Sequence, residues 1–275
     1  MATQRNTTAP RSLRAKLQAL CAAALMALAL VATPAAAART DFTDLWWNPA
    51  EPGWGVNLVQ AQTFLFATFF VYGPGNQPVW YTGEMSRNVA GAYAGPLYVT
   101  TGTAFNAPAN PAHKSARQVG DVTFTPSAAT TGTLSYTVDG VVVTKLVQRQ
   151  TLQTIPLGDS FIGGLVSQWS GCTDPNVNSS VRRHMNLHVT QVAADKKLEL
   201  DFDLNGTSCT LSGAYVQQGQ LYTMPGATYY CSNGLSTRAD VSELRSTARG
   251  IEGRWSASTG AGCTESVTFS AVLAM

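Results

Sequence analysis

The sequence has few charged residues and none of the motifs that mark the best-known enzyme classes. Charged side chains make up 12% of the 275 residues, whereas about 25% is usual in soluble domains. There is no G-x-S-x-G elbow, no H-E-x-x-H pair and no Walker loop, so no hydrolytic or nucleotide-binding motif is present. With three histidines, a Ser-His-Asp triad is not excluded, but no serine is singled out. We expect no cofactor.

Cysteines are scarce, and C-x-x-C pairs are absent. Apart from Cys21, the four cysteines lie in the second half of the chain, and an even number in an exported protein indicates two disulfides. Three pairings are possible. We favour Cys209–Cys231, which would bridge neighbouring strands, and Cys172–Cys263, which would join the first and last strands of that half. A zinc site is the alternative, but it lacks the usual ligand spacing.

The N-terminal residues 1–38 have the pattern of a signal peptide. A basic segment precedes an apolar, alanine-rich run from Leu17 to Val31, and small residues at 35–38 supply a cleavage site. The apolar run is shorter than the roughly 20 residues of a transmembrane helix. We therefore expect an exported protein, periplasmic or secreted, with no membrane span in the mature chain.

The slight positive charge of the chain comes from this predicted signal peptide. Cleavage after Ala38 would remove four of the 18 Lys and Arg residues and none of the 16 Asp and Glu residues, which changes the formal net charge from +2 to −2. No basic patch is left to bind nucleic acid, and there is no polybasic membrane anchor. We expect no nucleic-acid partner.

Alternating apolar and polar residues predict strands through most of the remaining chain, and helical periodicity is weak. Between two such runs, Asp139-Gly140 is a preferred two-residue hairpin turn. About seven strands are expected in residues 39–150. An antiparallel meander closed into a barrel, or a two-layer sandwich, would remove most exposed edges.

A domain boundary is expected at residues 151–160, which contain Pro156 and Gly158. The cysteines of the mature chain all follow this segment. The predicted organisation is therefore two all-β, antiparallel domains in tandem, at 39–150 and at 161–275, with the disulfides in the second.

Tryptophan is concentrated in the first domain. Three of the six tryptophans fall in the segment 46–55, which reads WWNPAEPGWG, and Trp80 follows in the next hairpin. Together with FATFFVYG at 66–73 and PVWY at 78–81, this segment resembles a module of exported bacterial proteins of uncharacterised function. The resemblance spans residues 46–81 only, and it implies no catalytic residues.

The tryptophan segment has two interpretations. In the first it is an aromatic platform, on which rings stack against a ligand such as a sugar and polar side chains supply hydrogen bonds. In the second the tryptophans fill the core, since Trp is highly buried on average. We expect Trp54 inside and at least one other ring exposed. The candidate ligand-binding residues are Trp46, Trp47, Asn48, Glu51 and Trp80.

A second candidate site lies in a predicted hairpin of the cysteine-bearing domain. If residues 193–196 form its turn, His188 faces Asp201 across the two strands, and His184 lies on the same face. These side chains could bind a divalent metal or act as acid and base. Pairs of opposite charge on a solvated face are also ordinary sheet stabilisation.

Three functions follow from these patterns. The first is an exported, non-enzymatic β-protein that binds a ligand or partner through its tryptophan-rich surface. The second is a hydrolase of cell-wall or extracellular polysaccharide, which would use carboxylates such as Glu51, Glu84 and Asp121. The third is a structural or assembly protein of the envelope.

Overall fold

The computed structural model describes residues 40–260 and 262–274. The predicted signal peptide, residues 1–38, lies outside these residues. The described chain forms two antiparallel eight-stranded barrels in tandem, so the all-β prediction is confirmed and the architecture is the barrel. Its helical segments are three single 3-10 turns, at Pro74–Asn76 (η1), Pro111–His113 (η2) and Pro175–Val177 (η3).

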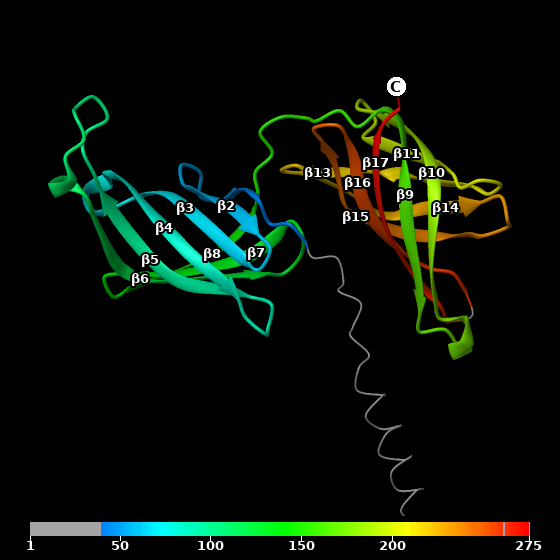
Figure 1. Ribbon diagram of the computed structural model, residues 1–275, viewed down its shortest axis with the longest axis horizontal. Coiled ribbons are helices and arrows are strands. Elements are labelled where there is room, and N and C mark those ends of the chain that lie inside the picture. The colour runs from blue at the N-terminus through cyan, green and yellow to red at the C-terminus, as the bar shows by residue number, and fades with distance from the viewer. Residues whose placement is uncertain (1–39, 261, 275) are drawn as a thin grey trace, which may run out of the picture. The chain divides into compact units, whose positions relative to one another are not determined.

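The first barrel is a meander in which each strand pairs with the next along the chain (Figure 1). It closes where the last strand pairs with the first, with Trp46 opposite Arg149. Its strands are Asp44–Trp47 (β1), Gly55–Ala61 (β2), Phe64–Tyr72 (β3), Pro78–Arg87 (β4), Tyr93–Thr101 (β5), Ser115–Pro126 (β6), Thr131–Val138 (β7) and Val141–Arg149 (β8).

The second barrel has a different strand order. Its first strand pairs with its last, and pairing of β12 with β14 closes the ring, while the short β13 pairs with the start of β14. Its strands are Asp159–Ser170 (β9), Ser179–Val192 (β10), Lys197–Asp203 (β11), Ser208–Ala214 (β12), Val216–Gln218 (β13), Leu221–Cys231 (β14), Ser236–Thr247 (β15), Gly250–Ser258 (β16) and Thr264–Leu273 (β17).

Turn chemistry sets the registers as the sequence predicts. Asp139 and Gly140 both have positive φ, 46° and 86°, which is the backbone of the tight hairpin turn that matches strand twist. In the β10–β11 hairpin, His188 lies opposite Asp201 and Leu187 opposite Phe202, as expected from a turn at 193–196.

Two details of the chain's organisation differ from the expectation. The barrel has eight strands where about seven were expected, because Asp44–Trp47, which includes the start of the tryptophan segment, forms the additional strand β1. The linker is also shorter than the expected 151–160, since β9 begins at Asp159. The first strand is difficult to predict from the sequence, because its four residues are too few to show a clear alternation and proline and glycine follow Trp47.

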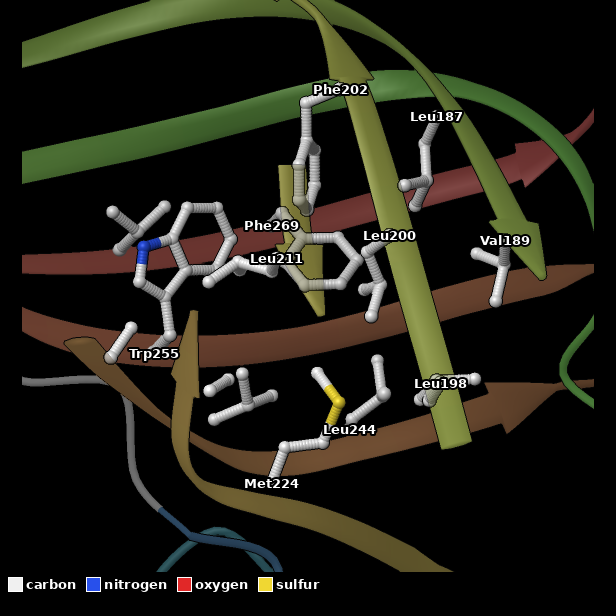
Figure 2. Packing of buried hydrophobic residues seen from close by; sticks show 14 of the residues in the cluster. Leu187, Val189, Leu198, Leu200, Phe202, Leu211, Met224, Leu244, Trp255 and Phe269 are labelled. Atoms are coloured by element: carbon white, nitrogen blue, oxygen red, sulfur yellow. The ribbon is translucent and has the colours of Figure 1, made fainter. Parts of the chain in front are cut away.

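Each barrel has its own hydrophobic core, because the buried side chains form two separate clusters. In the second barrel, Trp255 lies at the centre of an aromatic group, with its ring centroid 5.0 Å from that of Phe202 and 5.8 Å from that of Phe269 (Figure 2). Along each of the eight strands of the ring, side chains point alternately into and out of the barrel, and these aromatic residues occupy inward positions.

Both disulfides have the expected partners. Cys172 is bonded to Cys263, and Cys209 to Cys231. The second bond joins register partners on β12 and β14, which is the seam that closes the barrel. Two disulfides indicate a non-reducing compartment. No helix among the described residues is long and apolar enough to cross a bilayer.

A buried ion pair lies where the first barrel closes. The side chain of Arg149 is 1% exposed and that of Asp44 is 8% exposed, with Arg149 Nη1 3.0 Å from Asp44 Oδ2. The guanidinium also donates to the carbonyl oxygens of Ala129, Thr43 and Asp41. Burial lowers the pKa of Arg149, and the hydrogen bond and charge of Asp44 oppose this effect. All three nitrogens of the guanidinium therefore donate to protein oxygens.

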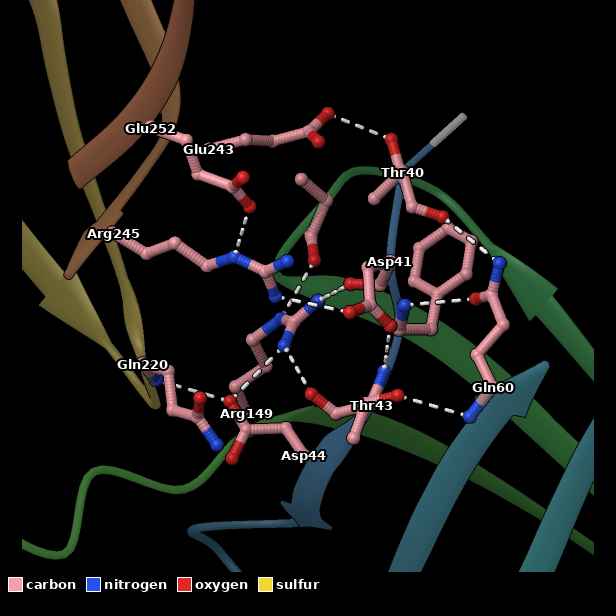
Figure 3. Close-up of polar contacts among 12 residues, drawn as sticks. Thr40, Asp41, Thr43, Asp44, Gln60, Arg149, Gln220, Glu243, Arg245 and Glu252 are labelled. Atoms are coloured by element: carbon pink, nitrogen blue, oxygen red, sulfur yellow. Dashed lines mark hydrogen bonds and ion pairs between the residues drawn. The ribbon is translucent and has the colours of Figure 1, made fainter. Parts of the chain in front are cut away.

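The same carboxylate and its neighbours also contact residues of the second barrel (Figure 3). The backbone N–H of Gln220 donates to Asp44 Oδ2 at 3.0 Å, and Arg245 Nη1 lies 3.0 Å from Asp41 Oδ2. Thr40 donates its hydroxyl to Glu243 at 2.7 Å. Asp44 thus accepts hydrogen bonds from both barrels.

We predict that Arg149→Ala lowers the free energy of unfolding by about 3–5 kcal/mol, because it leaves the buried Asp44 carboxylate without its cationic partner. The control is Arg117→Ala in the same barrel, whose side chain is 59% exposed in its pair with Asp139. Urea denaturation measures both. Equal, small effects of the two substitutions would contradict a structural role for the buried pair.

Candidate functional site

Trp46 belongs to the core of the first barrel. It is 0% exposed, its Nε1 donates to the Phe42 carbonyl at 3.0 Å, and its ring lies 5.0 Å from that of Phe124. The guanidinium of Arg149 lies 5.1 Å from the ring centroid. Its assignment as a ligand-binding residue is therefore wrong, because no face of the ring reaches solvent.

The polar residues of the tryptophan segment hold their own turn. Asn48 accepts from the Ala50 N–H at 3.0 Å and donates to Glu51 at 3.2 Å. Glu51 forms an ion pair with Lys145, whose ammonium lies 5.8 Å from the Trp54 ring centroid. These contacts occupy the groups that the sequence offered as ligand contacts, so their main role is to fix the segment between β1 and β2.

The two other rings of the segment are only partly exposed. Trp47 and Trp54 are both of intermediate burial, and the Nε1 atoms of both are buried without a hydrogen-bond partner. The ring of Trp54 packs against the barrel core. Neither ring therefore presents a free face with an accessible polar edge.

Trp80 has the opposite environment. It is 59% exposed on β4 and lies directly opposite Phe70 of β3, which is 51% exposed. Tyr72 is 61% exposed, opposite Pro78. Side chains that are opposite or two residues apart on one face of a sheet lie within contact distance. Phe70, Tyr72 and Trp80 therefore form one aromatic surface on the outside of the barrel.

A pocket opens beside this surface because two neighbouring strands separate. Pairing of β4 with β5 ends at Thr82 opposite Tyr98, although β3–β4 pairing continues to Pro78 and β5–β6 pairing to Thr101. The pocket has a volume of about 530 Å³. It is lined by Gly53, Phe70, Val71, Tyr72, Pro78, Val79, Trp80, Val99 and Thr100.

The lining of this pocket is apolar and uncharged. None of its residues carries an acidic or basic side chain. The tryptophan segment contributes only Gly53, whose φ of 108° is accessible to glycine and strained for other residues. The segment therefore shapes the edge of the pocket with its backbone, and β3, β4 and β5 supply the side chains. We define these nine residues as the aromatic pocket.

The aromatic pocket has the size and lining of a small-ligand site. Such sites have volumes of about 300–1,000 Å³ and apolar walls with few polar groups. Sequence reasoning did not select Phe70 and Tyr72, because both faces of β3 carry large apolar residues and alternation does not show which face is inside. Trp80 is the single sequence-selected residue that lines the pocket.

The histidine face of the second barrel does not form a metal cluster. His188 lies 3.0 Å from the Ser160 hydroxyl, and Asp201 accepts from the Thr210 hydroxyl at 2.6 Å. His184 is four residues from His188 on β10, a separation of about 13 Å in a strand. The described residues contain no group of three or more His, Cys, Asp or Glu side chains able to hold a metal.

Comparison with known proteins adds no functional assignment. No protein-family model matches this chain, and a search of curated proteins finds no similar sequence. We therefore infer function from the geometry of the sites alone.

We predict that Trp46→Ala lowers the free energy of unfolding by about 3–5 kcal/mol, because it removes a fully buried ring. Trp80→Ala should cost about 1 kcal/mol or less, since it loses only one cross-strand contact. Chemical denaturation of both variants gives the comparison. A large cost for Trp80→Ala would show that this ring is structural and would count against an aromatic binding surface.

Proposed function

We propose that this protein is an exported binding protein that holds a neutral glycan in the aromatic pocket of its first barrel. The observation that carries the proposal is the exposure of Phe70, Tyr72 and Trp80, between 51% and 61%, on paired strands beside an open pocket. Exposed apolar patches of this kind mark interaction sites. The disulfides and the predicted signal peptide support export.

The chemistry of the pocket favours a sugar over a charged ligand. Flat rings pack against the apolar faces of pyranose units, and the hydroxyls of a glycan need donors and acceptors at the edge of the ring. Thr100 and Tyr72 supply hydroxyl groups there. The backbone at the start of β4 and the end of β5 lacks partners from the neighbouring strand, so it offers further N–H and C=O groups.

The hydrolase hypothesis finds no support in the geometry around Glu51. Its carboxylate pairs with Lys145 and accepts from Asn48, and it does not line the aromatic pocket. Glu84 and Asp121 are likewise not among the lining residues. The envelope-assembly hypothesis predicts a protein occupant for the same exposed rings, and binding experiments separate it from a glycan.

The test is isothermal titration of residues 39–275 with neutral hexasaccharides of glucose and of N-acetylglucosamine. We predict binding that Trp80→Ala weakens at least tenfold, about 1.4 kcal/mol, with little change in thermal stability. The matched control is Tyr230→Ala, since Tyr230 is 53% exposed on the second barrel and should not affect affinity. Binding should not change between pH 5 and 8, because the aromatic pocket has no acidic or basic side chain.

Three results would contradict the proposal. Failure of every neutral glycan to bind would remove its ligand class. Equal loss of affinity in Tyr230→Ala would indicate non-specific adsorption to aromatic surfaces. Release of reducing ends from either hexasaccharide would show turnover and favour the hydrolase hypothesis.

A further inference from the structure

A second pocket lies at one end of the second barrel, and both disulfides line it. Its volume is about 380 Å³, and its walls include Cys209, Cys231 and Cys263. The mouths of β-barrels are common places for small-molecule sites. The lining residues that matter here are Ser167, Trp169, Arg183, Tyr229, Trp255 and Glu265.

Glu265 is a charged residue at an inward position. It alternates on β17 with the core residues Val267 and Phe269, and it is only 4% exposed. Its register partners are Ala257 on β16 and Trp169 on β9. The carboxyl group therefore belongs to the interior wall of the barrel.

The carboxyl group has hydrogen-bonding neighbours but no close cation. The hydroxyl groups of Ser167, which is 6% exposed, and Tyr229, which is 4% exposed, belong to residues that line the same pocket. None of the ion pairs found among the described residues includes Glu265. Arg183 influences it only as a more distant charge. A buried carboxylate without an adjacent cation is costly, so this position favours a bound counter-charge.

Burial shifts the pKa values of the acidic groups in this pocket. It raises the pKa of Glu265, and hydrogen bonds from Ser167 and Tyr229 and the charge of Arg183 only partly oppose the effect. Burial, together with the neighbouring Glu265, also raises the pKa of Tyr229. Ionisable groups with shifted pKa values in a pocket are candidates for functional groups.

The walls beside the carboxyl group are aromatic. The ring of Trp255 lies 5.9 Å from that of Tyr229 in an edge-to-face arrangement, and Trp169 also lines the pocket. Trp255 also packs against Phe202 and Phe269 (Figure 2), which holds the indole in place. Aromatic faces attract organic cations, and the attraction increases when water is excluded.

We propose that this pocket binds a small organic cation, whose ammonium group pairs with Glu265 and whose carbon atoms pack against Tyr229, Trp169 and Trp255. An anion is disfavoured, because it would lie next to the buried carboxyl group. Arg183 is exposed at the edge of the pocket, where its charge competes with a bound cation. The proposal is independent of the glycan proposal for the first barrel.

The charge of the ligand can be tested with three probes of similar shape. Benzylamine, benzyl alcohol and benzoate are titrated into residues 39–275 at pH 7.5, and the indole Nε1–H signals are followed by NMR. We predict that benzylamine shifts the signals of Trp169 and Trp255. Its dissociation constant should be at least tenfold lower than that of either other probe. Tighter binding of benzoate, equal binding of all three, or binding of none would overturn the proposal.

Two substitutions in the pocket should act in opposite directions. Glu265→Gln keeps the shape of the side chain and removes its charge, so benzylamine should bind at least tenfold more weakly. Arg183→Gln removes the competing charge at an exposed position, so benzylamine should bind more tightly. Thermal denaturation checks the fold of each variant. Weaker binding in Arg183→Gln would overturn the proposal even if Glu265→Gln failed to fold.

The pH dependence follows from the raised pKa of Glu265. In the free protein, the protonated carboxyl group stabilises the fold fully at pH values below 4.5, the ordinary pKa of the group. This stabilisation is lost as the pH rises through the higher pKa of the folded state. Benzylamine affinity should rise over the same interval, because the cation binds the ionised form. Arg183 and Glu265 are the two charged residues among those that line the pocket. A flat profile in the wild type, or an unchanged slope in Glu265→Gln, would contradict this account.

Discussion

The ion pair between Arg149 and Asp44 is the contact on which the first barrel depends most. It lies where the first and last strands meet, and the guanidinium covers the ring of Trp46 at 5.1 Å. Isolated charges are not tolerated at 1% and 8% exposure. The closure of the barrel, the burial of Trp46 and the backbone contact from Gln220 to Asp44 are therefore parts of one arrangement.

This arrangement explains why the tryptophan segment is mainly structural. The ring of Trp46 lies in the core. The polar side chains Asn48 and Glu51 bond to each other, and they also bond to the Ala50 backbone N–H and to Lys145. The aromatic residues available to a ligand come instead from the following hairpin, on the outer faces of β3 and β4. Gly53 connects the two, since it is the residue of the segment that borders the aromatic pocket.

Much of the fold was readable from local patterns, and the sites were not. Alternation and the Asp139-Gly140 turn predicted an antiparallel all-β chain, the 193–196 turn predicted the register of His188 with Asp201, and strand proximity predicted the disulfide partners. Alternation cannot say which face of a strand is inside when both carry large apolar residues, as around Phe69. The aromatic pocket results from the separation of β4 and β5, which is a tertiary property. Glu265 differs from the aromatic pocket in this respect. Its alternation with Val267 and Phe269, which places it on the inward face of the strand, is visible in the sequence.

Our central claim is that ligand contact and barrel structure involve different tryptophans. The direct measurement is a titration of 15N-labelled protein with a neutral hexasaccharide, in which the indole signals of the six tryptophans are observed separately. The account predicts that the Trp80 signal shifts in proportion to occupancy while that of Trp46 does not move. A shift confined to Trp46 or Trp47, with Trp80 unaffected, would contradict it.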